Sequence, residues 1–168
     1  MRLCFSNETP YLDTNSIFLA GPTKRNSFYS TSWRSVAVKY LNELNFTGTV
    51  YIPEYTDGTL FDSNYIEKQT EWEWDCLDTA GVILFWVPRK ITNDENTMPG
   101  FTTNVEFGIY SEKKPSQIIL GYPNDAEKMR YLEQRYCTVT GKKSCKTLYK
   151  SIVACLDLLE FNKKNLIK

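Results

Sequence analysis

Four short apolar runs, each ending in or followed closely by glycine or proline, constrain the fold of this chain more than any other feature. They occupy residues 16–20, 49–53, 81–87 and 117–121. Between and after them lie segments in which apolar residues recur at intervals of three and four, the period of an amphipathic helix. The pattern predicts strands that alternate with helices over residues 33–44, 64–80 and 102–113.

Such alternation is typical of a parallel sheet, because right-handed crossovers bring successive strands side by side. We therefore predict a single α/β domain with a flavodoxin-like, doubly wound parallel sheet of four to five strands. The domain is expected to span residues 16–161, between an irregular segment at 1–15 and a basic tail at 162–168. A possible edge strand lies at 136–139, and a last helix is expected over 144–161.

The bulk composition excludes several classes of function. The 20 basic and 20 acidic residues balance, so no polyanion-binding surface is indicated and nucleic acid is not an expected partner. Five scattered cysteines without a C-x-x-C pair predict reduced thiols. The sequence has neither a signal-peptide apolar region nor a run long enough to span a membrane. We expect a cytoplasmic protein with no membrane partner and no metal.

The chain contains no histidine. Any acid or base that works near neutral pH must therefore be a carboxylate, a tyrosine, a thiol, a lysine or bound water. Ser-His-Asp and Cys-His catalytic designs are excluded.

The segment 99–108, PGFTTNVEFG, lies between the third and fourth predicted strands, where open α/β sheets bind their ligands. Glu106 is expected in the first turn of a helix, where the helix dipole favours an ionised carboxylate that can act as a nucleophile. The alternative is a capping box from Thr103 to Glu106, in which the glutamate only satisfies a backbone amide.

The motif EWEW at 71–74 lies on the second predicted helix. Gln69, Trp72 and Glu73 share one helical face, which can stack a planar base and hydrogen-bond its edge. Apolar neighbours would raise the pKa of Glu73 and let it hold a proton for a leaving base. The alternative is that the tryptophans belong to the core and the glutamates to the solvated surface.

The first turn, AGPTKR, matches neither the dinucleotide-binding nor the Walker phosphate-binding pattern. It can still present backbone amides and Lys24 or Arg25 to a sugar or a phosphate, or it can be a plain turn. Arg34 and Arg89 are candidates to clamp an anionic group, with ordinary surface arginines as the alternative.

Taken in order, seven segments resemble the nucleoside 2-deoxyribosyltransferase family, particularly its phage and bacterial branch. The segments are IFLAGPTKR, SWR, VYIPEY, QTEWEW, FWVPR, PGFTTNVEFG and LGYP. The resemblance covers roughly residues 16–135. It implies a flavodoxin-like fold, cleavage of the N-glycosidic bond of a deoxynucleoside or deoxynucleotide, and transfer of the 2-deoxyribose to a free nucleobase.

The resemblance also implies roles for particular residues. Glu106 would attack the anomeric carbon to form a covalent deoxyribosyl ester, Asn104 would bind a sugar hydroxyl, and Glu73 would assist the base. The loop of Gly21, Pro22 and Thr23 would border the sugar. No cofactor is required, and a homo-oligomer is expected.

One position departs from the family. Better-known members have a tyrosine in the first strand that steadies the nucleophile, whereas this chain has Phe18. Another hydroxyl, such as that of Tyr55 or Tyr110, could substitute. Two further functions therefore stay open: an N-glycoside hydrolase acting on deoxynucleoside 5'-monophosphates or NAD-like substrates, and a non-catalytic protein that binds or sequesters nucleotides.

Overall fold

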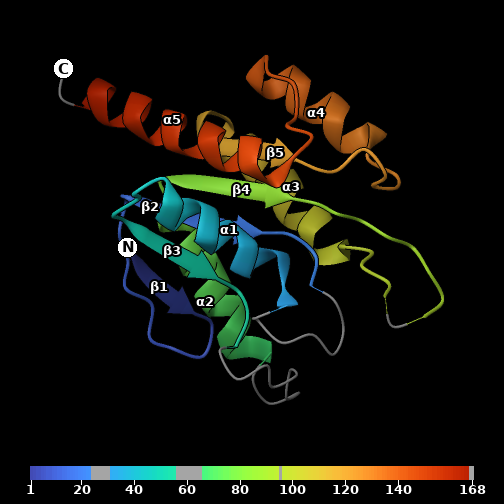
Figure 1. Ribbon diagram of the computed structural model, residues 1–168, viewed down its shortest axis with the longest axis horizontal. Helices are drawn as coiled ribbons and strands as arrows, with labels where there is room; N and C mark the ends of the chain where they lie inside the picture. Colours follow the sequence, from blue (N-terminus) through green and yellow to red (C-terminus); the bar gives the residue numbers. More distant parts are fainter. Residues whose placement is uncertain (24–30, 56–65, 95, 167–168) are drawn as a thin grey trace.

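The computed structural model describes the chain except residues 24–30, 56–65, 95 and 167–168. Its elements follow one another as strands and helices along the chain (Figure 1). They are β1 (Arg2–Phe5), β2 (Ser16–Ala20), α1 (Trp33–Glu43), β3 (Thr49–Ile52), α2 (Ile66–Thr79), β4 (Val82–Trp86), α3 (Phe101–Lys113), the 3-10 helix η3 (Pro115–Gln117), β5 (Ile118–Gly121), α4 (Arg130–Thr140) and α5 (Leu148–Leu166).

The five strands form one parallel sheet in the order β1-β3-β2-β4-β5. From β2 the chain runs outward to β3, then crosses back over β2 to form β4 on its other side. The topological switch point therefore lies between β2 and β4. This order confirms the predicted flavodoxin-like, doubly wound fold.

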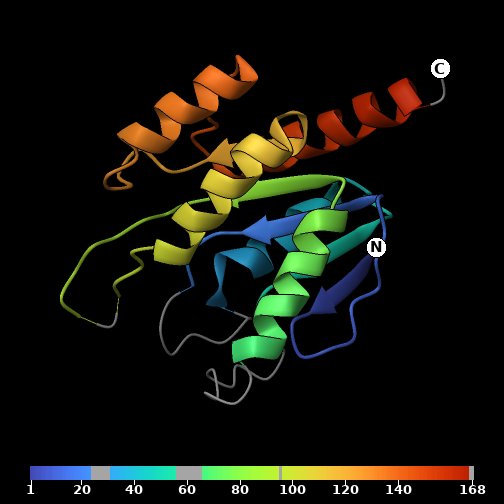
Figure 2. The same cartoon turned by 180° about the vertical axis from the view of Figure 1, so that it is seen from behind.

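Helices cover both faces of the sheet (Figures 1 and 2). Residues of α1 and α5 pack on one face, and residues of α2, α3 and α4 pack on the other. In β2, Ile17 and Leu19 belong to the first of these cores, whereas Phe18 and Ala20 belong to the second. Every residue of β2 and β4 is buried, as expected for central strands without a solvated face.

The start of α3 corrects the prediction for Glu106. The helix is preceded by Gly100 in the left-handed conformation, with φ of 63°, and no side chain caps it. Thr103 is thus the third residue of the helix rather than its cap, so the capping box is absent. Glu106 is the sixth residue and lies in the second turn, beyond the first turn in which the helix dipole acts most strongly.

Two further predictions of secondary structure are wrong. Residues 2–5, expected to be irregular, form β1, because pairing with β3 supplies order that so short an apolar segment does not indicate by itself. Residues 136–139, considered as an edge strand, continue α4 up to Gly141, and the ring of Tyr136 is buried in the core. Tertiary packing here overrides the β-propensity of a short segment.

On α3, Phe107 and Tyr110 are buried, whereas Val105 and Ile109 are largely exposed. Together with the exposed Phe101 they form an apolar stripe with a spacing of four residues. The stripe is compatible with the expected homo-oligomer, which stays a prediction. No helix in the described part of the chain is long and apolar enough to cross a membrane.

Gly21 and Gly108 provide a matched test of the packing at the end of β2. A Cβ at Gly21 would lie 2.1 Å from the carbonyl oxygen of Trp86 on β4, and the φ of 153° disfavours other residues; at Gly108 a Cβ would meet nothing within 4 Å. We expect Gly21→Ala to lower the free energy of unfolding by at least about 2 kcal/mol. Gly108→Ala should raise it by about 0.5–1 kcal/mol. Urea denaturation measures both, and equal effects would contradict this account.

Candidate active site

A cavity of about 380 Å³ opens at the carboxyl ends of the strands, next to the switch point. Its walls come from the turn after β2, from Pro53 after β3, from α1 and α2, and from the segment that leads into α3. Ligands of open α/β sheets bind at this position, and residues far apart in the sequence meet there.

The structure brings together most of the residues that the sequence predicted for the site. Those that line the cavity are Gly21, Pro22, Thr23, Arg34, Gln69, Glu73 and Glu106. Arg25 lies outside the described residues. Trp72, Arg89 and Asn104 do not line this cavity.

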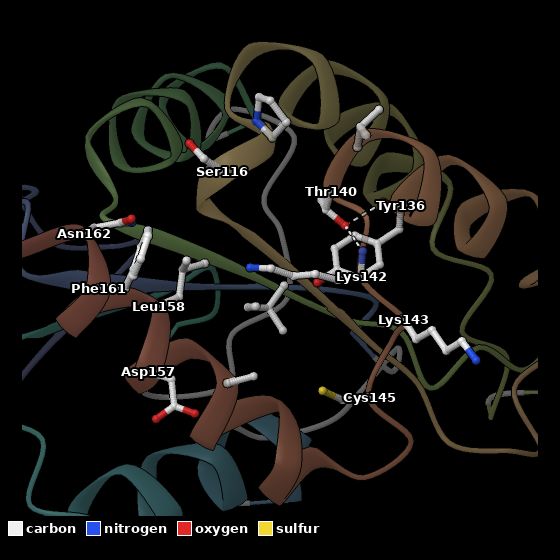
Figure 3. Close-up of a pocket in the computed structure, with 14 residues that line it drawn as sticks. Ser116, Tyr136, Thr140, Lys142, Lys143, Cys145, Asp157, Leu158, Phe161 and Asn162 are labelled. Carbon is white, nitrogen blue, oxygen red and sulfur yellow. Dashed lines mark hydrogen bonds between the residues drawn. The ribbon is translucent and has the colours of Figure 1, made fainter. Parts of the chain in front are cut away.

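A larger cavity of about 830 Å³ lies between β5, α4 and α5 (Figure 3). The residues around it include Tyr136, Leu158, Lys142 and Asp157. Among the described residues, its lining contains a single carboxylate and none of the residues that the sequence predicted for the site. The smaller cavity is therefore the better candidate for acid–base chemistry.

Glu73 on α2 and Glu106 on α3 face the same cavity, and the pKa values of both carboxyl groups are raised there. Burial, followed by the charge of Glu73, raises the pKa of Glu106 to about 7. Burial also raises the pKa of Glu73, and a hydrogen bond of 2.9 Å from Gln69 Nε2 to Glu73 Oε1 opposes that rise. The raised pKa of Glu73 agrees with the prediction from the sequence, whereas the raised pKa of Glu106 contradicts the prediction that its environment favours the ionised form.

Two coupled carboxylates with raised pKa values share protons as a unit. Around neutral pH the pair can hold one proton, so that one group acts as an acid while the other is an ionised nucleophile or base. This is the chemistry that the absence of histidine left open.

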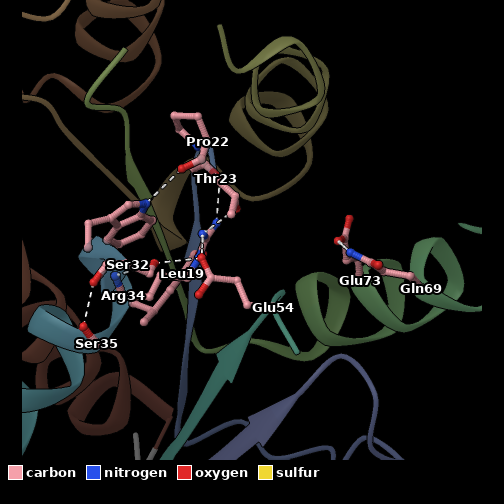
Figure 4. A network of polar contacts seen from close by, with 11 residues as sticks. Leu19, Pro22, Thr23, Ser32, Arg34, Ser35, Glu54, Gln69 and Glu73 are labelled. Carbon is pink, nitrogen blue, oxygen red and sulfur yellow. Dashed lines mark hydrogen bonds and ion pairs between the residues drawn. The ribbon is translucent and has the colours of Figure 1, made fainter. Parts of the chain in front are cut away.

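Arg34 does not serve as the anion clamp that the sequence suggested, because its donors are used within the protein (Figure 4). It is 1% exposed. Its guanidinium contacts Glu54 Oε1 at 2.6 Å, Thr23 Oγ1 at 2.8 Å, and the carbonyl oxygens of Leu19 and Gly21 at 2.8 and 2.6 Å. Arg34 thus fixes the loop that borders the cavity.

Trp72 belongs to the core, which corrects the prediction that it stacks on a base. Its side chain is 5% exposed, and its ring centroid lies 6.2 Å from that of Phe18 and 6.3 Å from that of Tyr51. Phe18 is itself buried in this cluster. Tyr110 does not replace the missing hydroxyl, because its own hydroxyl donates to Asp78 Oδ1 at 2.8 Å.

Arg89 and Asn104 lie together beside a different cavity, between α3 and α4. Arg89 Nη2 donates to Asn104 Oδ1. The predicted roles of Asn104 at a sugar hydroxyl and of Arg89 at the substrate therefore do not fit the geometry. Residues two positions apart on a helix point to different sides, so Glu106 and Asn104 line different cavities.

Sequence reasoning missed two parts of the site. One is the wall formed by Thr97 and residues 99–103, although the sequence places 99–108 where open α/β sheets bind their ligands. The other is Glu54, the buried partner of Arg34. Its place immediately after a strand that ends in proline was the available signal, since the carboxyl ends of parallel strands converge.

A doubly wound α/β sheet with two carboxylates in a cavity at its switch point can support acid–base chemistry without histidine. Comparison with protein-family models matches residues 14–125, which are 112 of the 168 residues, to the family described as nucleoside 2-deoxyribosyltransferase like. The chain belongs to this family. Its branch within the family stays a prediction. A search of the curated proteins gives no match.

The ion pair of Arg34 and Glu54 can be tested against an exposed pair. We expect Glu54→Gln to lower the free energy of unfolding by about 3 kcal/mol, because it leaves the buried guanidinium without its counter-charge. The matched change Glu43→Gln, in a solvent-exposed pair with Lys39 at 4.0 Å, should cost less than about 0.5 kcal/mol. Chemical denaturation of both variants checks the difference, and a small loss in Glu54→Gln would contradict the assigned role of Arg34.

Proposed function

We propose that this protein cleaves the N-glycosidic bond of a deoxynucleoside or deoxynucleotide and transfers the 2-deoxyribose to a second nucleobase. The observation that carries the proposal is that Glu73 and Glu106, from two different helices, line one cavity at the switch point. Membership of the nucleoside 2-deoxyribosyltransferase-like family supports a reaction at a deoxyribosyl group.

In the first step the Glu106 carboxylate attacks C1' of the sugar. The bond between C1' and the base nitrogen breaks, its electron pair stays on the base, and Glu73 donates a proton to the departing base. The product is an ester between Glu106 and deoxyribose. Carboxylate attack divides one difficult displacement into two easier ones through oxocarbenium-like transition states.

In the second step a nitrogen of the acceptor base attacks C1', and Glu106 leaves as a carboxylate. Glu73 takes up the proton that the acceptor loses, which restores the starting protonation state. If water attacks instead, the same site is an N-glycoside hydrolase.

The position of Gln69 supports the role of Glu73 as the proton donor. Its Nε2 donates to Oε1 of Glu73, which leaves Oε2 of that carboxyl to carry the proton. Gln69 Oε1 is buried without a hydrogen-bond donor among the described residues. We infer that it accepts a hydrogen bond from the edge of the bound base, because an unsatisfied buried carbonyl oxygen is costly.

Two alternatives share this cavity. Hydrolysis is favoured if the second base finds no defined place in it. A non-catalytic binding protein is favoured by Phe18, whose buried ring provides no hydroxyl to the nucleophile. Incubation of a deoxynucleoside or its 5'-monophosphate, and of NAD, with and without a second base distinguishes the three: a new nucleoside indicates transfer, free sugar indicates hydrolysis, and neither indicates binding alone.

Replacing the nucleophile provides the direct test. We expect Glu106→Gln to reduce cleavage on the order of 10³-fold or more, because the amide cannot attack C1'. Glu71→Gln, at an exposed position of α2, should keep the wild-type rate. Mass spectrometry of the wild-type protein after brief exposure to substrate should detect a deoxyribosyl adduct on Glu106. Full activity in Glu106→Gln would overturn the proposal.

The pH dependence follows from the shared proton. The active state holds one proton on the pair, and this proton leaves as the pH rises above about 7. We expect kcat/KM to fall about tenfold per pH unit above that value.

The same titration links pH to folding. Because the folded-state pKa of Glu106 is raised from 4.5 to about 7, its contribution to stability is complete below about 4.5 and is lost as the pH rises through about 7. We expect Glu106→Gln to have a higher melting temperature than the wild type at pH 8, and a smaller difference at pH 4.5. Calorimetry at the two pH values measures this, and equal differences would contradict the burial of a charged Glu106.

A further inference from the structure

A second cavity, of about 680 Å³, lies between α3 and α4, apart from Glu73 and Glu106. Its charged lining residues are Arg89, Lys128, Arg135 and Glu112, and Asn104 and Tyr131 also border it. In the described part of the lining, three cations face one carboxylate. The function proposed above makes no use of this cavity.

Arg89 is the unusual member of this group. Its side chain is 4% exposed, and burial lowers its pKa. Nη1 donates to the carbonyl oxygen of Lys128 at 3.3 Å and Nη2 donates to Asn104 Oδ1, but Nε is buried without an acceptor among the described residues. In that part of the chain no carboxylate forms an ion pair with it.

A buried guanidinium with only neutral acceptors costs folding free energy, because its charge is desolvated without an opposite charge to compensate. Glu112 does not fill this role. Its carboxylate forms an ion pair with Arg135, and its side chain is 79% exposed. The lining therefore keeps an excess of positive charge around a buried, unpaired N–H donor.

We propose that Arg89 is the centre of a binding site for a phosphate-class oxyanion, either inorganic phosphate or the phosphomonoester of a nucleotide. The planar guanidinium offers its remaining N–H groups to phosphate oxygens, and Lys128 adds a compact positive charge at the rim. Asn104 holds the guanidinium in place. The site is separate from the proposed reaction, because Asn104 and Glu106 present their side chains to different cavities.

The central variant is Asn104→Asp. It places a carboxylate where the amide oxygen now contacts Arg89, in the first turn of α3, where the helix dipole also favours negative charge. The new carboxylate should form an ion pair with the Arg89 guanidinium and repel an external anion, without unfolding the protein. Asn42→Asp, at an exposed position of α1, makes the same charge change elsewhere and serves as the control.

Titration calorimetry of the full chain with inorganic phosphate, with 2-deoxyribose 5-phosphate and with a deoxynucleoside 5'-monophosphate tests the site. We expect wild type, Asn42→Asp and Glu106→Gln to bind phosphate alike. Asn104→Asp should bind it at least tenfold more weakly with an unchanged or higher melting temperature, and Arg89→Gln should also lose binding. Tighter binding of the monophosphate than of phosphate, with the added affinity lost in Asn104→Asp, identifies a nucleotide as the ligand of this site, and equal loss of both in that variant identifies free phosphate.

Three results would overturn the proposal: wild-type protein that does not bind phosphate, Asn104→Asp that binds it as tightly as Asn42→Asp, or binding that is lost in Glu106→Gln but kept in Asn104→Asp. The last result would assign the anion to the cavity of the two glutamates. The test measures anion binding rather than glycosidic cleavage, so its failure would leave the proposed function unaffected. Likewise, absence of glycosidic cleavage would leave the proposal of an anion site unaffected.

Discussion

The buried ion pair between Arg34 and Glu54 is the interaction on which the arrangement of the candidate active site depends. One guanidinium holds the end of β2 through the carbonyls of Leu19 and Gly21, the adjoining loop through Thr23, and the segment after β3 through Glu54. Hydrophobic packing can bring these strands together, but it cannot fix the position of polar loops at their ends. A desolvated, multiply hydrogen-bonded cation does so because every broken contact would leave a buried polar group unsatisfied.

The same cavity shows a tension between stability and chemistry. Burial raises the pKa values of Glu73 and Glu106, and the charge of Glu73 adds to the rise for Glu106. The arrangement costs folding free energy at neutral pH but keeps a proton available without histidine. Arg89 shows a related feature on the other side of α3, where a buried charge has no carboxylate partner among the described residues and its Nε has no acceptor there. Sites at which a protein tolerates such costs are candidates for function.

Much of the fold was predictable because its signals are local. The apolar runs of β2, β3, β4 and β5, and the punctuation after them, specify the strand order along the chain and the edge where ligands bind. β1 escaped prediction because its order comes from pairing with β3. The prediction of an edge strand at 136–139 is wrong because β-branched and aromatic residues can also complete a helix when one of them is buried, as Tyr136 is. The left-handed Gly100 likewise moved the start of α3.

The sequence by itself determined the alternation of elements, the carboxyl edge as the site, the exclusion of histidine chemistry, and the candidacy of Glu73 and Glu106. Only the tertiary structure decided that Arg34 holds a loop rather than a ligand, that Trp72 is core, and that Asn104 and Arg89 face a separate cavity. It also decided that Glu106 resists ionisation. These properties depend on burial and on charges that segments distant in the chain contribute. The local spacing of residues encodes neither the burial nor these charges.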